Sequence, residues 1–227
     1  MKPARLELLL ILCLLAVAPA YGNNAARTDE PIRPVPAPSG LDPRKVALGS
    51  KLFSDPSLSR DGKIACASCH GLDQGGTDHR RHSIGVGGAE GAINAPSVFN
   101  SALNFREFWD GRAASLEAQV DGPLQASAEM GAAWPDVLVR LNRSPGYSAA
   151  FAAIYADGVS RENVKNAIAE FERSLVATNS RFDRWLRGDE GAIDAAEKAG
   201  YRKFKDFGCV SCHQGANVGG NMFQRMG

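Results

Sequence analysis

Cysteine is scarce in this sequence, and almost all of it stands in one kind of motif. Only five cysteines occur in 227 residues. Cys13 lies within an apolar N-terminal run, and the other four form two Cys-x-x-Cys pairs, each followed directly by histidine. No cysteine outside the pairs is left for the disulfide framework that stabilises many small exported proteins. The two pairs therefore carry most of the chemical information in the chain.

An excess of charge of one sign is also lacking, since the formal net charge is only +1. A nucleic-acid-binding domain normally has a marked excess of lysine and arginine. We therefore exclude nucleic acid as a partner. A local charged patch for docking a redox partner stays open, because net charge does not reveal it.

Long apolar runs are absent except at the N-terminus. Lys2 and Arg5 precede an apolar run at residues 8–17, and small residues follow at 18–20. The run is shorter than the roughly 20 residues that a membrane-spanning helix needs. We interpret residues 1–22 as a cleaved secretory signal peptide, which implies a periplasmic protein without a stable membrane anchor.

The rest of the chain shows helical periodicity and almost no strand pattern. Residues 23–40 are rich in proline and are interpreted as an extended, poorly ordered leader. Asp42 and Pro43 predict the start of a helix that runs to about Phe53. Further helices are expected at 113–119, 134–142, 145–155, 161–178, 181–187 and 192–207. Between 71 and 101 the sequence predicts a long irregular loop, which we interpret as functional.

The two Cys-x-x-Cys-His motifs are typical of covalent haem attachment. Two cysteines on one helical turn can form thioethers with a haem, and the adjacent histidine can bind its iron. Zinc would require the two distant pairs to converge, and a thioredoxin-like site would need a βαβ setting. We predict two covalently bound haem c groups. The attachment residues are Cys66, Cys69 and His70 in the first motif and Cys209, Cys212 and His213 in the second.

A weak internal repeat predicts two similar haem domains. Residues 48–53 (LGSKLF) precede the first motif, and residues 199–204 (AGYRKF) precede the second. Each segment is expected to form a helix that leads into a Cys-x-x-Cys-His motif. The fold class is therefore mostly α.

From about Leu48 onward the chain resembles the bacterial di-haem cytochrome c peroxidases. Besides the two motifs, the matching segments are 52–56, 83–85, 94–98, 108–113, 122–125, 129–130 and 181–186, in family order. The resemblance implies two cytochrome-c-like haem domains. Residues 41–180 would form the N-terminal peroxidatic domain with its connecting helices. Residues 181–227 would begin the C-terminal electron-transfer domain, which is expected to be truncated.

The resemblance also implies an activity, the reduction of hydrogen peroxide to water. The His70 haem would be the peroxide-reactive centre. The His213 haem would receive electrons from a small cytochrome c or copper protein. A homodimer is compatible with this interpretation.

Further roles follow from the resemblance. Glu129 matches the distal glutamate that moves the proton during peroxide cleavage. Gln125 lies four residues earlier, and we expect it to share a helical face with Glu129 and to hydrogen-bond peroxide. Trp109 matches a tryptophan between the haems that offers an electron route; core packing is the alternative. Asn94 matches a calcium ligand, and an amide oxygen suits that ion.

Val86 departs from the family pattern. In familiar members a histidine follows Ser-Ile-Gly and ligates the peroxidatic iron at rest. Here Val86 follows residues 83–85, so we hypothesise that the His70 haem is five-coordinate or water-bound at rest. His79 and His82 are the only spare histidines. Either could substitute as an iron ligand, but their charged surroundings favour a surface turn.

Chain length is the second departure. The sequence stops at Gly227, before the segment in which the family places a methionine opposite the second histidine. Met222 and Met226 do not match that position. We interpret the sequence as truncated.

Two other functions compete with the peroxidase interpretation. A related di-haem oxidase would act on a protein or an organic substrate, and Val86 fits that group as well. A non-catalytic electron carrier is the third candidate. Glu129 and Gln125 disfavour it, because carriers normally keep six iron ligands.

Overall fold

The computed structural model describes residues 26–225, and it is almost entirely helical within that range. The expected signal peptide lies outside the described residues. Pairing between extended segments is limited to three isolated bridges in the described part. No helix there has the length and apolar character required to cross a bilayer. The helical structure of residues 26–225 confirms the predicted fold class, mostly α.

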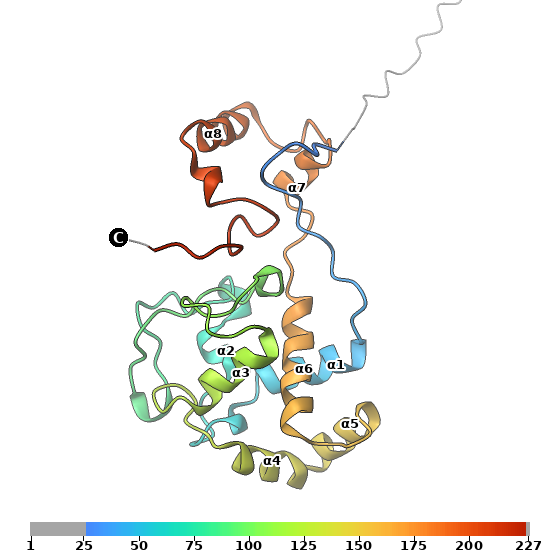
Figure 1. Ribbon diagram of the computed structural model, residues 1–227. Helices are drawn as coiled ribbons and strands as arrows, with labels where there is room; N and C mark the ends of the chain where they lie inside the picture. The colour runs from blue at the N-terminus through green and yellow to red at the C-terminus, as the bar shows by residue number, and fades with distance from the viewer. Residues whose placement is uncertain (1–25, 226–227) are drawn as a thin grey trace, which may run out of the picture.

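The structure consists of two lobes (Figure 1). The larger lobe contains α1 to α6, and the smaller lobe contains α7 and α8. The helices of the larger lobe are α1 (Pro43–Phe53), α2 (Cys66–Cys69), α3 (Leu116–Gln125), α4 (Trp134–Arg143), α5 (Pro145–Ile154) and α6 (Arg161–Ser174). Those of the smaller lobe are α7 (Arg181–Leu186) and α8 (Ala195–Asp206).

Helix caps explain where the elements begin. The Asp42 carboxylate accepts a hydrogen bond from the Arg44 backbone N–H, and Pro43 occupies the first turn, so the predicted α1 is confirmed. Helix α3 starts at Leu116 rather than at 113, because the Ser115 hydroxyl caps it. Helix α6 ends at Ser174, four residues before its predicted end.

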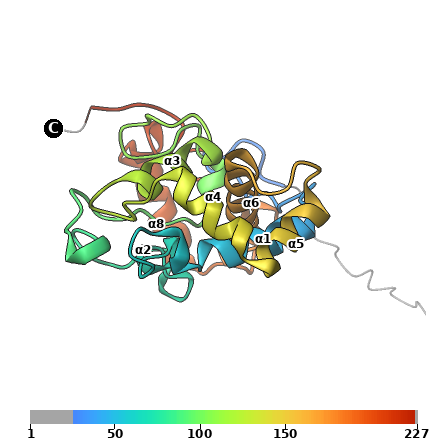
Figure 2. The ribbon, with the colours of Figure 1, turned by 90° about the horizontal axis from the view of Figure 1, so that it is seen from below.

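The crossing of α1 over α6 forms the centre of the larger lobe (Figures 1 and 2). Gly49 makes the close approach possible, since a Cβ atom there would overlap the Ala167 carbonyl oxygen. Phe53 and Phe171 meet edge to face beside this crossing, with ring centroids 5.3 Å apart. On α6, Val164, Ile168 and Phe171 are buried, and Leu175, directly after the helix, is partly buried.

The N-terminal segment differs from the poorly ordered leader that we expected. Residues 26–40 are extended, but they pack against the smaller lobe. Ile32 is only 3% exposed and pairs with Gly215 in a parallel bridge. The Val35 backbone N–H donates to the Asp183 carboxylate at 2.8 Å. The segment is therefore a structural part of the smaller lobe. Its prolines favour an extended backbone, and its contacts hold that backbone against the lobe.

Candidate functional site

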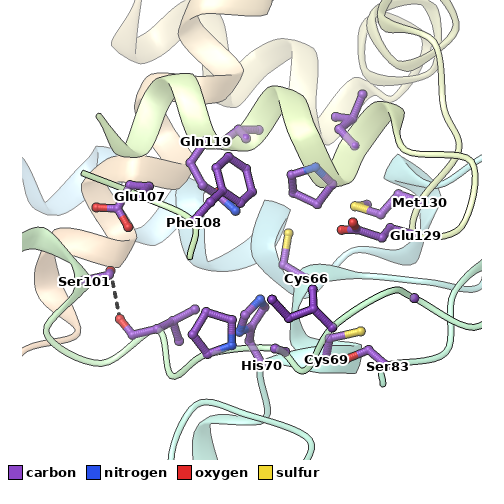
Figure 3. A pocket seen from close by; sticks show the side chains of 18 of the residues that line it. Cys66, Cys69, His70, Ser83, Ser101, Glu107, Phe108, Gln119, Glu129 and Met130 are labelled. Carbon is purple, nitrogen blue, oxygen red and sulfur yellow. Dashed lines mark hydrogen bonds between the residues drawn. The ribbon is translucent and has the colours of Figure 1, made fainter. Parts of the chain in front are cut away.

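A cavity of about 480 Å³ lies in the larger lobe between α2, α3 and the irregular loop at 83–98. Figure 3 shows Cys66, Cys69 and His70 on one side, with Phe108, Gln119 and Glu129 on the other. The size falls in the range of pockets that hold small molecules and cofactors. The loop that we interpreted as functional forms part of its wall.

The Cys66–Cys69 pair is poorly suited to thiol exchange. Helix α2 is a single turn with both cysteines on it, and the two residues line the same cavity. Burial raises the pKa of the Cys66 thiol to about 12, so this sulfur is not a ready thiolate nucleophile. The zinc alternative fails as well. No group of three or more His, Cys, Asp or Glu side chains suited to a metal occurs between residues 26 and 225.

The His70 ring has one nitrogen, Nε2, that could bind a metal. Its Nδ1 lies 3.1 Å from the Gly76 carbonyl oxygen. Because a carbonyl can only accept, Nδ1 carries the proton and Nε2 keeps the lone pair that a metal needs. Burial lowers the pKa of His70, which favours the neutral, ligating form.

The second motif repeats this arrangement in the smaller lobe. His213 Nδ1 lies 3.1 Å from the Val218 carbonyl oxygen. Phe53 and Phe204 are equivalent positions of the sequence repeat, and their rings lie 6.4 Å and 6.2 Å from the rings of His70 and His213. The weak repeat in the sequence is therefore a repeat in structure.

A hollow of about 330 Å³ lies beside α8. It is lined by Ile32, Phe182, Gly200, Tyr201, Phe204 and Val218. Ile32 comes from the N-terminal segment, so that segment forms part of this hollow.

Glu129 lines the His70 cavity, as expected for a group that would act on a bound substrate. Its carboxyl group is directed into the cavity in Figure 3. Partial burial raises the pKa of this carboxyl, and the charge of Arg112 opposes the shift. A carboxyl group with a raised pKa is better suited to accept and return a proton near neutral pH.

Gln125 does not share a helical face with Glu129, and that expectation is wrong. Helix α3 ends at Gln125, and the following residues form a turn. The Gln125 amide donates to the Asp121 carbonyl of its own helix at 3.1 Å, and the side chain does not line the cavity. Gln119 lines it instead, two turns earlier on α3 (Figure 3). Ser115, which caps the start of α3, was the sequence signal that could have placed Gln119 on this helix.

Trp109 lies at the edge of the cavity and is 65% exposed. Its indole N–H lies 3.5 Å from the Asn94 carbonyl oxygen, which is a weak contact. Core packing, the alternative considered for this residue, is therefore excluded. Asn94 also lines the cavity, but no cluster of acidic ligands gathers around it in the described chain.

Val86 and the two spare histidines leave the cavity without an additional imidazole. Val86 is 2% exposed, and its backbone N–H donates to the Glu129 carbonyl at 2.8 Å. His82 lies beside Glu90, with 2.9 Å between Nδ1 and the carboxylate, on an outer turn. His79 lies on the same turn, and neither histidine lines the cavity. His79 is exposed and His82 is partly exposed, so both lie at the surface, as expected.

The fold and the two sites define a protein of two cytochrome-c-like lobes, each with an attachment motif and an oriented histidine. The sequence profile described as "Di-haem cytochrome c peroxidase" matches residues 43–191. The chain therefore belongs to the di-haem cytochrome c peroxidase family.

Individual relatives agree with this assignment. The chain is 48% identical to cytochrome c peroxidase Ccp of Escherichia coli (strain K12), over 91% of this chain and 45% of the relative. It is 42% identical to cytochrome c551 peroxidase of Nitrosomonas europaea, over 96% of this chain and 65% of the relative. The crystal structure of a MauG-like protein associated with microbial copper homeostasis matches with a TM-score of 0.72 and 29% identity. That match covers 90% of this chain and 63% of the other. The chain thus spans between about half and two thirds of the length of these proteins.

Proposed function

We propose that this chain is part of a periplasmic di-haem peroxidase that reduces hydrogen peroxide to water with electrons from a small cytochrome c or copper protein. The observation that carries the proposal is the placement of Glu129 and Gln119 across the cavity from His70. A simple electron carrier has no need of a cavity with a proton-transfer group opposite its iron ligand.

The residues of the cavity fit a covalently attached haem. Cys66 and Cys69 would form the thioethers, and Nε2 of His70 would bind the iron. The bound haem would supply the iron at which peroxide is cleaved and the electrons that the reaction consumes. Cys209, Cys212 and His213 would hold the second haem in the same way.

Glu129 moves the proton in this proposal. Its carboxylate takes a proton from one peroxide oxygen and delivers it to the other, which leaves as water. The Gln119 amide hydrogen-bonds peroxide and orients it. Two electrons and two protons enter for each peroxide, so that two waters form. Trp109 extends the electron route from the second site, and Asn94 contributes an oxygen to calcium.

Val86 supports a His70 site that needs no prior reduction. No imidazole competes with peroxide for the cavity in the described chain. We expect a high-spin ferric signal in the electron paramagnetic resonance spectrum of the oxidised full-length protein. A spectrum with low-spin haem alone would contradict the open site.

Site-directed variants of the full-length protein test the proposed peroxidase activity. We expect Glu129→Gln to lower kcat/KM for peroxide by about 10²–10⁴-fold, measured by oxidation of a reduced small cytochrome c. Gln125→Ala is the matched control, since this side chain is directed back to its own helix, and it should keep wild-type activity. Full activity in Glu129→Gln would overturn the proton-transfer role.

Oxidation of a protein or an organic substrate is the second candidate. Val86 and the high exposure of Trp109 favour it, because an exposed indole offers an electron route to a bound partner. Consumption of peroxide without any oxidation of the small electron donor would support this candidate. A protein that neither consumes peroxide nor changes its haem spectrum with it would be an electron carrier.

A further inference from the structure

Two buried carboxyl groups line the His70 cavity outside the roles described so far. Glu107 is 8% exposed and Glu172 is 6% exposed, and both belong to the cavity wall. Glutamate is almost never buried to this extent unless it is paired. Neither residue forms a salt bridge with any group between residues 26 and 225.

Glu172 is the less satisfied of the two. Its Oε2 atom is buried and has no hydrogen-bond partner in the described structure. Arg173, the next residue on α6, forms ion pairs with other acids: it lies 2.6 Å from Glu117 and 3.4 Å from Glu170. A charged carboxylate with no cation and no donor is costly in such a wall, so Glu172 is stable there only when it is protonated.

Glu107 is the better satisfied of the two carboxyl groups. Burial raises the pKa of Glu107, and the Asn104 amide, which donates to Glu107 Oε2 at 3.4 Å, opposes this shift. In turn Asn104 Oδ1 accepts a hydrogen bond of 2.5 Å from the amide of Asn217. Glu107 therefore has a hydrogen-bond donor, whereas Glu172 Oε2 has none, and we assign the proton to Glu172.

Asn217 connects the pair to the second site. It precedes Val218, whose carbonyl oxygen accepts from His213 Nδ1. The Phe105 backbone N–H also donates to the Gly220 carbonyl at 3.2 Å, so the two lobes meet along this line. The hydrogen bonds from the His213 loop therefore end at the acid pair of the other cavity.

We propose that Glu172 holds one proton in the wall of the His70 cavity and that the binding of this proton is linked to the electron that the site accepts. This inference rests on the proposed function, since it requires the His70 haem. One electron from the small redox donor reduces the ferric site. The added negative charge raises the proton affinity of Glu172. At a pH at which Glu172 is not already protonated, it then takes up one proton from solvent. The net charge of the cavity then stays unchanged.

The groups that face Glu172 all allow this link. Glu107 approaches from the 104–113 segment, Glu117 from α3 and Cys66 from α2, while Arg173 follows on α6. Burial comes first among the causes that raise the pKa of Glu172 to about 8, and the charge of Glu107 comes second. An electron on the order of 10 Å away in a medium of effective dielectric about 20 raises proton affinity about tenfold. Proton uptake on reduction is therefore expected from about pH 8 upward.

The reduction potential of the His70 haem, measured by spectroelectrochemistry in the full-length protein between pH 6 and pH 10, tests the inference. We expect the potential to be constant below about pH 8 and to fall with pH above this value. Glu172→Gln should abolish the fall. Glu107→Gln should shift its onset to lower pH, because the like charge is removed.

Glu162→Gln is the matched control, because it removes the same charge from the exposed start of α6. It should leave the onset unchanged. If wild-type protein and Glu172→Gln show the same pH dependence, the inference is wrong. A second readout on the wild-type protein does not require the variant to fold. Infrared spectra of the oxidised protein at pH 7 should show the C=O stretch of a protonated, buried carboxyl group, and its absence would also overturn the inference. Loss of peroxide turnover with an intact pH dependence would reject the proposed function alone.

Discussion

Glu172 gives the stability of the protein a pH dependence of predictable sign. In the unfolded chain this carboxyl has a pKa of 4.5, and burial raises it to about 8 in the folded structure. Between these values the folded protein keeps a proton that the unfolded chain releases. Stability is therefore lost as pH rises through this interval and becomes level above it. At about 1.4 kcal/mol per pKa unit, the full shift corresponds to about 5 kcal/mol.

The Glu172→Gln variant removes this component, since glutamine binds no proton in the range. Other groups, including a bound haem, contribute equally to both proteins, so the difference between their stabilities isolates Glu172. Urea denaturation at pH 5, 6, 7 and 8 would measure it. We expect the stability of the wild-type protein to fall relative to the variant by several kcal/mol from pH 5 to pH 8. Parallel pH profiles would refute the protonated, buried Glu172.

Three further predictions concern the fold and the electron route. Gly49→Ala should lower stability by roughly 1–3 kcal/mol or more, because the Cβ of the alanine has no space against Ala167. Thermal unfolding measures the loss. Asp183→Ala removes the Asp183 half of the capping box that starts α7 at Ser180, together with the acceptor of the Val35 N–H. We expect a loss of about 1–2 kcal/mol and faster proteolysis within residues 26–40. Unchanged proteolysis would contradict the packing of that segment. Trp109→Phe should slow electron delivery to the His70 site at constant stability, since the indole is exposed; an unchanged rate in stopped-flow spectroscopy would exclude it from the route.

Local signals in the sequence predicted the elements that depend on local chemistry. Asp42 and Pro43 located the start of α1, and the cysteine spacing located both attachment sites. Helix ends were less predictable. Helix α6 ends at Ser174, and nothing in the apolar pattern, which continues to Leu175, marks that end.

Side-chain direction was harder to predict than helix position. The assignment of Gln125 assumed that α3 continued to Glu129, and the turn after Gln125 breaks that register. For the same reason, the sequence did not identify Gln119 as a cavity residue. Glu107 and Glu172 lie 65 positions apart in the sequence, and only the packing of α6 against the 104–113 segment places both in one wall.

The N-terminal segment shows how composition can mislead. Its prolines predicted an extended chain, and it is extended. Its partners, however, lie about 150 to 180 residues away: Asp183 accepts from Val35, and Tyr201 donates to Glu30. No local pattern predicts such contacts.

The stoichiometry of the reaction with peroxide tests the central claim most directly. The full-length protein would be mixed with a reduced small cytochrome c and a limiting amount of hydrogen peroxide. We predict that two donor electrons are consumed for each peroxide and that catalysis depends on Glu129. Electron consumption that is absent, or that is independent of peroxide, would contradict a peroxide-reducing site at His70.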